Sequence, residues 1–247
     1  MIAILQWGTL IVCSAVLILR VPDAVQGRNR MVFGILLIAT VCSLLSVPAP
    51  YEAVDRVLGG WNATHLILRF LVFTAVLLVG LRVARGLGDA RGHRLIAGTV
   101  GRSALALSAA AVAVIFFQMD TRGSSAGLLD LADDGGRNAA LAPFYAAAGR
   151  AYPAFVSLVL LPALLAAAAG TLPRLVRAGA AATCLGALAT VLSVPASFTP
   201  EDWAPGAHLV NYLAVLGYVL GLCLFWVSGR AARESGNTRA TFRKDSG

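Results

Sequence analysis

Charged residues are scarce in this chain of 247 residues, and several sequence motifs of enzymes are missing. Only 13% of the residues are charged, 58% are hydrophobic and the mean hydropathy is +0.79, whereas about a quarter of the residues in a soluble protein are charged. The single lysine is Lys244, near the C-terminus, which excludes a retinal Schiff base inside a helical bundle. P-loop, HExxH and CxxC motifs are absent, so the sequence gives no basis for the sites that these motifs mark. The composition predicts a membrane protein.

Seven apolar runs are long enough to cross a bilayer, whose hydrocarbon core takes about 20 helical residues. They occupy 2–19, 31–47, 63–81, 95–117, 152–169, 178–194 and 207–227. The runs do not alternate between apolar and polar residues as barrel strands do. None contains Asp or Glu, which weakens the case for transport coupled to a buried carboxylate. The sequence therefore predicts an all-α integral membrane protein, with a seven-helix bundle over 1–228 and a basic cytoplasmic tail over 229–247.

The cations are divided unevenly between the connections of this bundle. Fourteen of the 20 Lys and Arg residues lie in alternate connections and in the tail, whereas only Arg56, Arg122 and Arg137 lie in the remaining connections. Because cationic loops stay on the cytoplasmic side, we expect the N-terminus outside and the C-terminus inside a bacterial plasma membrane. No basic residue precedes the first run, which indicates a retained helix rather than a signal peptide. The formal net charge of +8 then reflects topology, not nucleic-acid binding.

The pentapeptide Leu-Ser-Val-Pro-Ala occurs at 45–49 and again at 192–196. Each copy continues through an aromatic residue, acidic residues, a Trp and a His-Leu pair, with an apolar run before and after it. In chain order these residues are Tyr51, Glu52, Asp55, Trp61 and His65 in the first copy, and Phe198, Glu201, Asp202, Trp203 and His208 in the second. Such self-similarity predicts a parallel internal repeat, with three-helix units at 1–81 and 152–227 joined by a connector helix at 95–117.

Two resemblances follow from these segments. The 3+1+3 arrangement resembles that of the SWEET sugar carriers, although their Pro-Gln signature is absent here, which leaves sugar transport unsupported. Residues 30–81, with AVDRVLGGWNATHL after Pro48, and the later segment LPRLVRAGAAATCLGALAT resemble a group of uncharacterised actinobacterial multi-helix membrane proteins described as candidate transporters. The Ala- and Arg-rich composition agrees with such an origin. This resemblance implies transport.

Arg69 is the cation that lies deepest in an apolar run, six residues after the start of the third run. A charge inside a span costs about 2.5–3.5 kcal/mol on insertion scales and by default marks a functional site. The alternative is a structural cation held by Asp55, Glu52 or backbone carbonyl groups. His65 precedes Arg69 by four residues, so the two side chains share one face of a helix. We expect this face to point toward the bundle or an outer vestibule.

His65 and His208 are matched by the repeat and should lie at similar depth. Two imidazoles that converge there could hold haem or a metal ion, or both could be polar residues at the membrane interface. Arg102 and Arg150 lie nearer the ends of their segments, where snorkelling accounts for them. The candidate ligand-binding residues are His65, Arg69, His208, Trp61, Trp203 and Asn211.

These features favour a protein that binds or transports a small molecule through an outward-facing, acid-rimmed cavity between two halves. One alternative is an intramembrane enzyme of the terpene-cyclase type, with Glu52 or Asp55 and Glu201 or Asp202 as proton donor and stabiliser. Another is an accessory or sensory subunit, in which haem is an open option. Apart from that option we expect no cofactor. The expected partners are the lipid bilayer and a small-molecule ligand, and association with a second copy or another membrane protein stays open.

The orientation can be tested by cysteine labelling in intact cells, in a background that lacks the four native cysteines. An impermeant thiol reagent should reach cysteines introduced near Asp55, Asp133 and Asp202, because these positions lie in connections poor in cations. Cysteines near Arg91 and Arg239 should react only after the cells are opened. Labelling of the Arg91 connection from outside would contradict the predicted orientation.

Overall fold

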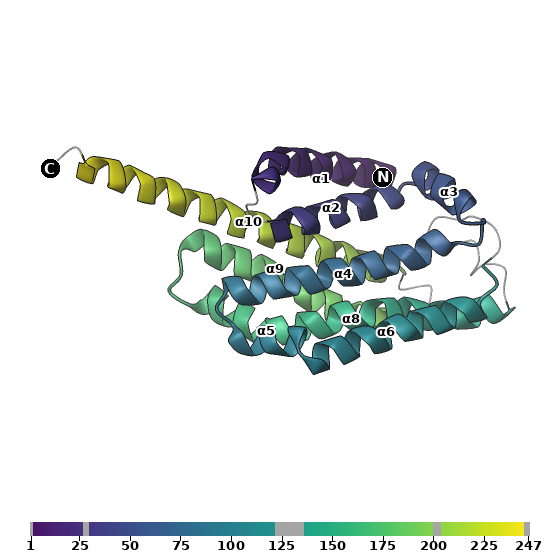
Figure 1. Cartoon of the computed structure of the whole chain (residues 1–247). Coiled ribbons are helices and arrows are strands. Elements are labelled where there is room, and N and C mark those ends of the chain that lie inside the picture. Colours follow the sequence, from purple (N-terminus) through teal and green to yellow (C-terminus); the bar gives the residue numbers. More distant parts are fainter. Residues whose placement is uncertain (1, 27–29, 122–135, 200–203, 245–247) are drawn as a thin grey trace.

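A computed structural model of the chain is all-helical over the residues that it describes, which are 2–26, 30–121, 136–199 and 204–244 (Figure 1). Each of the seven predicted segments is helical over most of its length, so the all-α prediction is confirmed. The elements are α1 (Ile2–Val25), α2 (Arg30–Leu45), α3 (Pro48–Val57), α4 (Ala63–Gly86), α5 (Ala90–Ala97), α6 (Thr99–Gln118), α8 (Gly136–Ala169), α9 (Arg174–Leu192), the 3-10 turn η1 (Pro195–Phe198) and α10 (Ala204–Lys244).

Several of these helices have the length and composition of membrane spans. Within the described ranges, five helical segments are long and apolar enough to cross a bilayer, and the number is six if α2 and α3, bent by 93° at their junction, form one broken span. Large apolar side chains point outward from the helices: Leu107, Phe117 and Leu185 are each more than 65% exposed. In water such a surface would aggregate, but in a bilayer it faces lipid. The chain is a multi-pass membrane protein.

The boundaries of two elements differ from the predicted ones. The predicted connector is divided at Gly98 into α5 and α6, and the Asp89 side chain caps α5 by accepting a hydrogen bond of 2.8 Å from the Gly92 N–H. Gly98 adopts an extended conformation with φ −80° and ψ −168°, which ends one helix and begins the next. The fifth helix, α8, begins at Gly136 rather than at Tyr152, because the Ala-rich segment before the apolar run also favours a helix.

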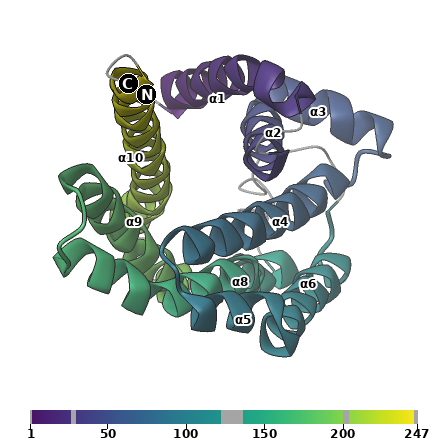
Figure 2. The same ribbon diagram turned by 60° about the vertical axis from the view of Figure 1, so that its left-hand side comes forward.

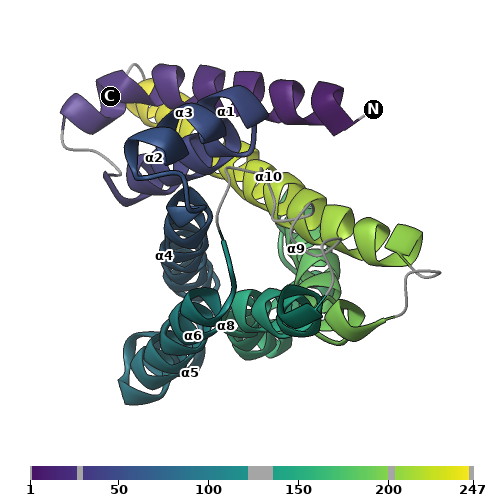
Figure 3. The ribbon, with the colours of Figure 1, turned by 90° about the vertical axis from the view of Figure 1, so that its right-hand side faces the viewer.

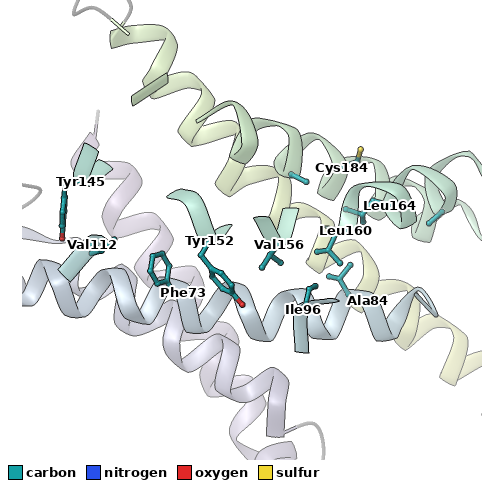
Figure 4. Close-up of a cluster of buried hydrophobic side chains, with 14 of the residues drawn as sticks. Phe73, Ala84, Ile96, Val112, Tyr145, Tyr152, Val156, Leu160, Leu164 and Cys184 are labelled. Carbon is teal, nitrogen blue, oxygen red and sulfur yellow. The ribbon is translucent and has the colours of Figure 1, made fainter. Parts of the chain in front are cut away.

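The core surrounds α8. Tyr152, Val156, Leu160 and Leu164 recur every four residues on one face of this helix and are at most 1% exposed (Figure 4). That face packs against residues of α4, α5, α6 and α9, among them Phe73, Val83, Ala84, Ile96, Val112, Phe116, Ala180, Cys184 and Ala187. Figures 2 and 3 show α1, α2 and α3 grouped on one side of α4, away from α8. The most densely packed part of the bundle is therefore the contact of α8 with its neighbours.

Small residues bring α9 and α10 into close contact. A Cβ atom on Gly217 would lie 2.5 Å from the Cα atom of Gly186, and one on Gly221 would overlap the Thr183 hydroxyl. Gly217 and Gly221 form a GxxxG pattern, which lets the backbones of two membrane helices approach closely. The backbone of each helix thus takes the place that side chains would otherwise fill.

The two copies of the repeated pentapeptide have matching helix boundaries, although Val47 is extended before the α-helix α3 and Val194 is helical before the 3-10 turn η1. In each copy a long helix ends at the leucine, and a short helix begins at the proline. The serine between them donates to a carbonyl of the preceding helix, from Ser46 to Cys42 at 2.8 Å and from Ser193 to Thr190 at 2.7 Å. Proline is favoured at the first positions of a helix because its missing N–H needs no partner there. The repeat over whole three-helix units, the count of seven spans and the orientation remain predictions.

Candidate functional site

The start of α4 is fixed by a buried carboxylate. Asp55 is fully buried, and its two oxygen atoms accept hydrogen bonds from the backbone N–H groups of Asn62, at 3.0 Å, and Thr64, at 3.1 Å. Negative charge is stabilising at this position because the first N–H groups of a helix lack partners and the helix dipole is positive there. Asp55 thus closes the turn between α3 and α4. We call this end of the bundle, which the cation pattern predicts to be outside, the predicted outer end.

Asn62 connects this turn to two other helices. It has a left-handed backbone, with φ +57°. Its side chain accepts a hydrogen bond from the Tyr51 hydroxyl at 2.8 Å and donates one to the Thr121 carbonyl, after α6, at 3.1 Å. The Asn138 amide, at the start of α8, exchanges two bonds of 2.9 Å with the backbone of Asp120. This network joins α3, α4, α6 and α8 at the predicted outer end. Apart from the turn residues before α4, no sequence pattern predicted it.

His65 and Arg69 meet the same residue of α8, as their four-residue spacing predicted. Nδ1 of His65 lies 3.0 Å from the Tyr145 hydroxyl oxygen, and Cζ of Arg69 lies 5.5 Å from the centre of the Tyr145 ring. The guanidinium also lies against Gly149, where a Cβ atom would come within 2.9 Å of Cζ. The Nε atom of Arg69 is buried and has no hydrogen-bond partner in the described part of the chain. Arg69 therefore packs between helices rather than toward lipid.

A second guanidinium lies beside this contact. Arg150 follows Gly149 on α8, is partly buried and donates a hydrogen bond from Nη1 to the Ser197 hydroxyl of η1. Gly149, on which the Arg69 guanidinium packs, is the residue directly before Arg150. Phe198 of η1 also packs edge to face on Phe144 of α8, with ring centres 5.4 Å apart. Arg150 thus has a hydrogen-bond partner in η1, which covers this part of α8, and its snorkelling to the interface stays a prediction.

A surface hollow lies at the same end of the bundle but on other residues. Its volume is about 500 Å³. It is lined by Gly59, Gly60, Trp61, Phe116, Phe117, Met119, Asp120 and Thr121. Trp61, a predicted ligand-binding residue, is 48% exposed there. Neither His65 nor Arg69 is among the lining residues of this hollow. The cavity that the sequence predicts to be bordered by His65, Arg69 and His208 stays a prediction.

The remaining predicted site residues are scattered or lie outside the described residues. Glu52 is exposed on α3, and Asn211 is partly buried on α10. Glu201, Asp202 and Trp203 lie outside the described residues, and so does the side chain of His208, whose backbone belongs to α10. Within the described ranges no three His, Cys, Asp or Glu residues converge as metal ligands. Haem or metal binding by His65 and His208 stays a prediction.

Comparison with known proteins adds no functional assignment. No protein-family model matches the chain, and no curated protein or solved structure is significantly similar to it. The likeness to actinobacterial candidate transporters and to the 3+1+3 carriers accordingly stays at the level of sequence pattern. The function has to be argued from the contacts of the chain's own residues.

The role of Asp55 can be separated from acid catalysis by stability. Replacing Asp55 with Ala should lower the free energy of unfolding by about 1–3 kcal/mol, because two backbone N–H groups lose a charged acceptor. Replacing the exposed Glu52 with Ala, the matched control, should change it by less than about 0.5 kcal/mol. Denaturant unfolding in detergent, followed by circular dichroism, measures both. An Asp55→Ala variant as stable as the wild type would contradict the capping role and leave Asp55 available as a proton donor.

Proposed function

We propose that the protein binds or moves a small molecule through the predicted outer half of its bundle, at the contact of α4 and α8. The observation that carries the proposal is the environment of Arg69. Its Cα atom lies about 9 Å along α4 from the start of the helix, at 1.5 Å per residue. The Arg69 guanidinium packs on Tyr145 and Gly149. A cation kept in a membrane helix, despite its cost, is a marker of a substrate or ion pathway.

A purely structural cation would need acceptors that satisfy its charge and its N–H groups. Removing one partner of a buried ion pair is strongly destabilising, so structural cations in spans are held by acids or by several backbone oxygens. The Nε atom of Arg69 lacks a hydrogen-bond partner in the described part of the chain. Asp55, an acid of the first copy of the repeat, accepts hydrogen bonds from two backbone N–H groups at the start of α4. These contacts favour a charge that is kept for a ligand.

The wider proposal joins this site to the predicted topology. This wider proposal includes the seven spans, the outside N-terminus, the location in a bacterial plasma membrane and the parallel repeat. It is supported by the 14 to 3 division of the cations and by the matching helix boundaries at the two pentapeptides. In a parallel repeat the ligand site would lie between the halves, and α4 and α8 belong to different halves. The cyclase alternative gains no support, because Asp55 serves as a helix cap.

Replacing Arg69 with Gln tests this proposal. The variant should insert into the membrane as well as the wild type, since removal of a charge eases insertion. In ligand-free protein its melting temperature should stay near that of the wild type. A small molecule that copurifies with the wild-type protein and is detected by mass spectrometry should be lost. The matched control is Arg102→Gln, which removes an exposed cation of α6 and should keep the molecule. Marked destabilisation of Arg69→Gln, by the roughly 3–5 kcal/mol of a broken buried pair, would favour a structural role instead.

A further inference from the structure

The chemical class of the ligand follows from the charges around Arg69, and this inference rests on the proposed function. The Arg69 guanidinium packs on Gly149 of α8, and Arg150 is the next residue of that helix, so two positive charges lie close together. Their described polar neighbours, Tyr145 and Ser197, are neutral hydroxyl groups. Two like charges in a partly desolvated site repel each other, and neutral neighbours do not compensate them. An anion that enters this region would replace that repulsion by attraction.

The free atoms of Arg69 indicate how an anion would bind. A guanidinium presents N–H groups in a rigid planar fork that matches two oxygen atoms of a carboxylate or phosphate. Nε belongs to one edge of that fork, and it is the buried nitrogen without a partner. The missing side chain of Gly149 lets this group lie directly on α8. The acceptor that Ser197 gives Arg150 is neutral. A charged oxygen in its place would form a stronger hydrogen bond with Arg150.

We propose that the ligand carries a phosphate or carboxylate group, which accepts hydrogen bonds from the Nε edge of Arg69 and is attracted by Arg150. The segment η1 holds Arg150 from the other side of α8, because Ser197 accepts its hydrogen bond and Phe198 packs on Phe144. His65 contributes through Tyr145, whose hydroxyl it holds at 3.0 Å. Arg69 is the main binding residue, and His65 is a positioning residue.

Thermal unfolding of the purified full-length protein in detergent tests the assignment. Inorganic phosphate, hexanoate and the neutral isostere hexanamide are titrated at constant ionic strength against sodium chloride. With phosphate or hexanoate the melting temperature of the wild type should rise with the logarithm of the concentration, as it does for a ligand of the folded state. Arg69→Gln should need at least about a tenfold higher concentration for the same rise. Arg102→Gln should behave like the wild type.

The outcomes separate this inference from the proposed function. Stabilisation by hexanamide that depends on Arg69, without any by the anions, would overturn the anionic class but support a ligand site at Arg69. Equal anion effects in the wild type and Arg69→Gln, or no effect at all, would overturn the inference. The proposed function is tested separately by the molecule that copurifies with the wild type. Loss of that molecule from Arg69→Gln would support a ligand site at Arg69 whether the molecule is charged or neutral.

A second arm distinguishes a soluble anion from a lipid headgroup. Wild type and Arg69→Gln are placed in nanodiscs of phosphatidylcholine with or without phosphatidylglycerol. Stabilisation by phosphatidylglycerol that is lost in Arg69→Gln identifies a lipid phosphate as the anion. Stabilisation by inorganic phosphate or hexanoate, with no dependence on phosphatidylglycerol, identifies a soluble one. The absence of an Arg69-dependent effect in both arms would contradict the proposal.

Discussion

The contact of the Arg69 guanidinium with α8 is the interaction on which this account of the molecule depends. It places a charge between two membrane helices, and the guanidinium uses the space left by Gly149, where a Cβ atom would come within 2.9 Å of Cζ. The remaining contacts of α4 keep that charge in place. Asp55 and Asn62 fix the start of the helix, and Phe73 packs edge to face on Tyr152 of α8 farther along, with ring centres 5.7 Å apart.

Much of the fold could be predicted from the sequence, because the apolar runs and the absence of charge within them are local signals. The helical class and the approximate positions of the spans follow from these runs alone. The break at Gly98 and the sharp bend between α2 and α3 could not be predicted in the same way. Each depends on how a short segment packs against helices that are distant in sequence, and hydropathy carries no information on such contacts.

The candidate site was predictable only in part. The depth of Arg69 in an apolar run and its spacing from His65 identified both residues and their common helix face. The residues they contact, Tyr145 and Gly149, lie about 80 positions away in an Ala-rich helix with no distinctive pattern. Arg150 looked like an interfacial anchor because only its distance from the end of an apolar run was visible. Its contact with Ser197 depends on the fold of η1 over α8.

The central claim is that the charge of Arg69 is kept for a ligand and not for an acid of the chain. Glu201 and Asp202 follow η1 in the sequence and are the acids of the second copy. A double-mutant cycle between Arg69→Gln and the paired change Glu201→Gln with Asp202→Asn measures their coupling directly, from free energies of unfolding in ligand-free protein. The account predicts additive effects, with a coupling energy below about 0.5 kcal/mol. A coupling above about 1.5 kcal/mol, which is typical of side chains in direct contact, would contradict it.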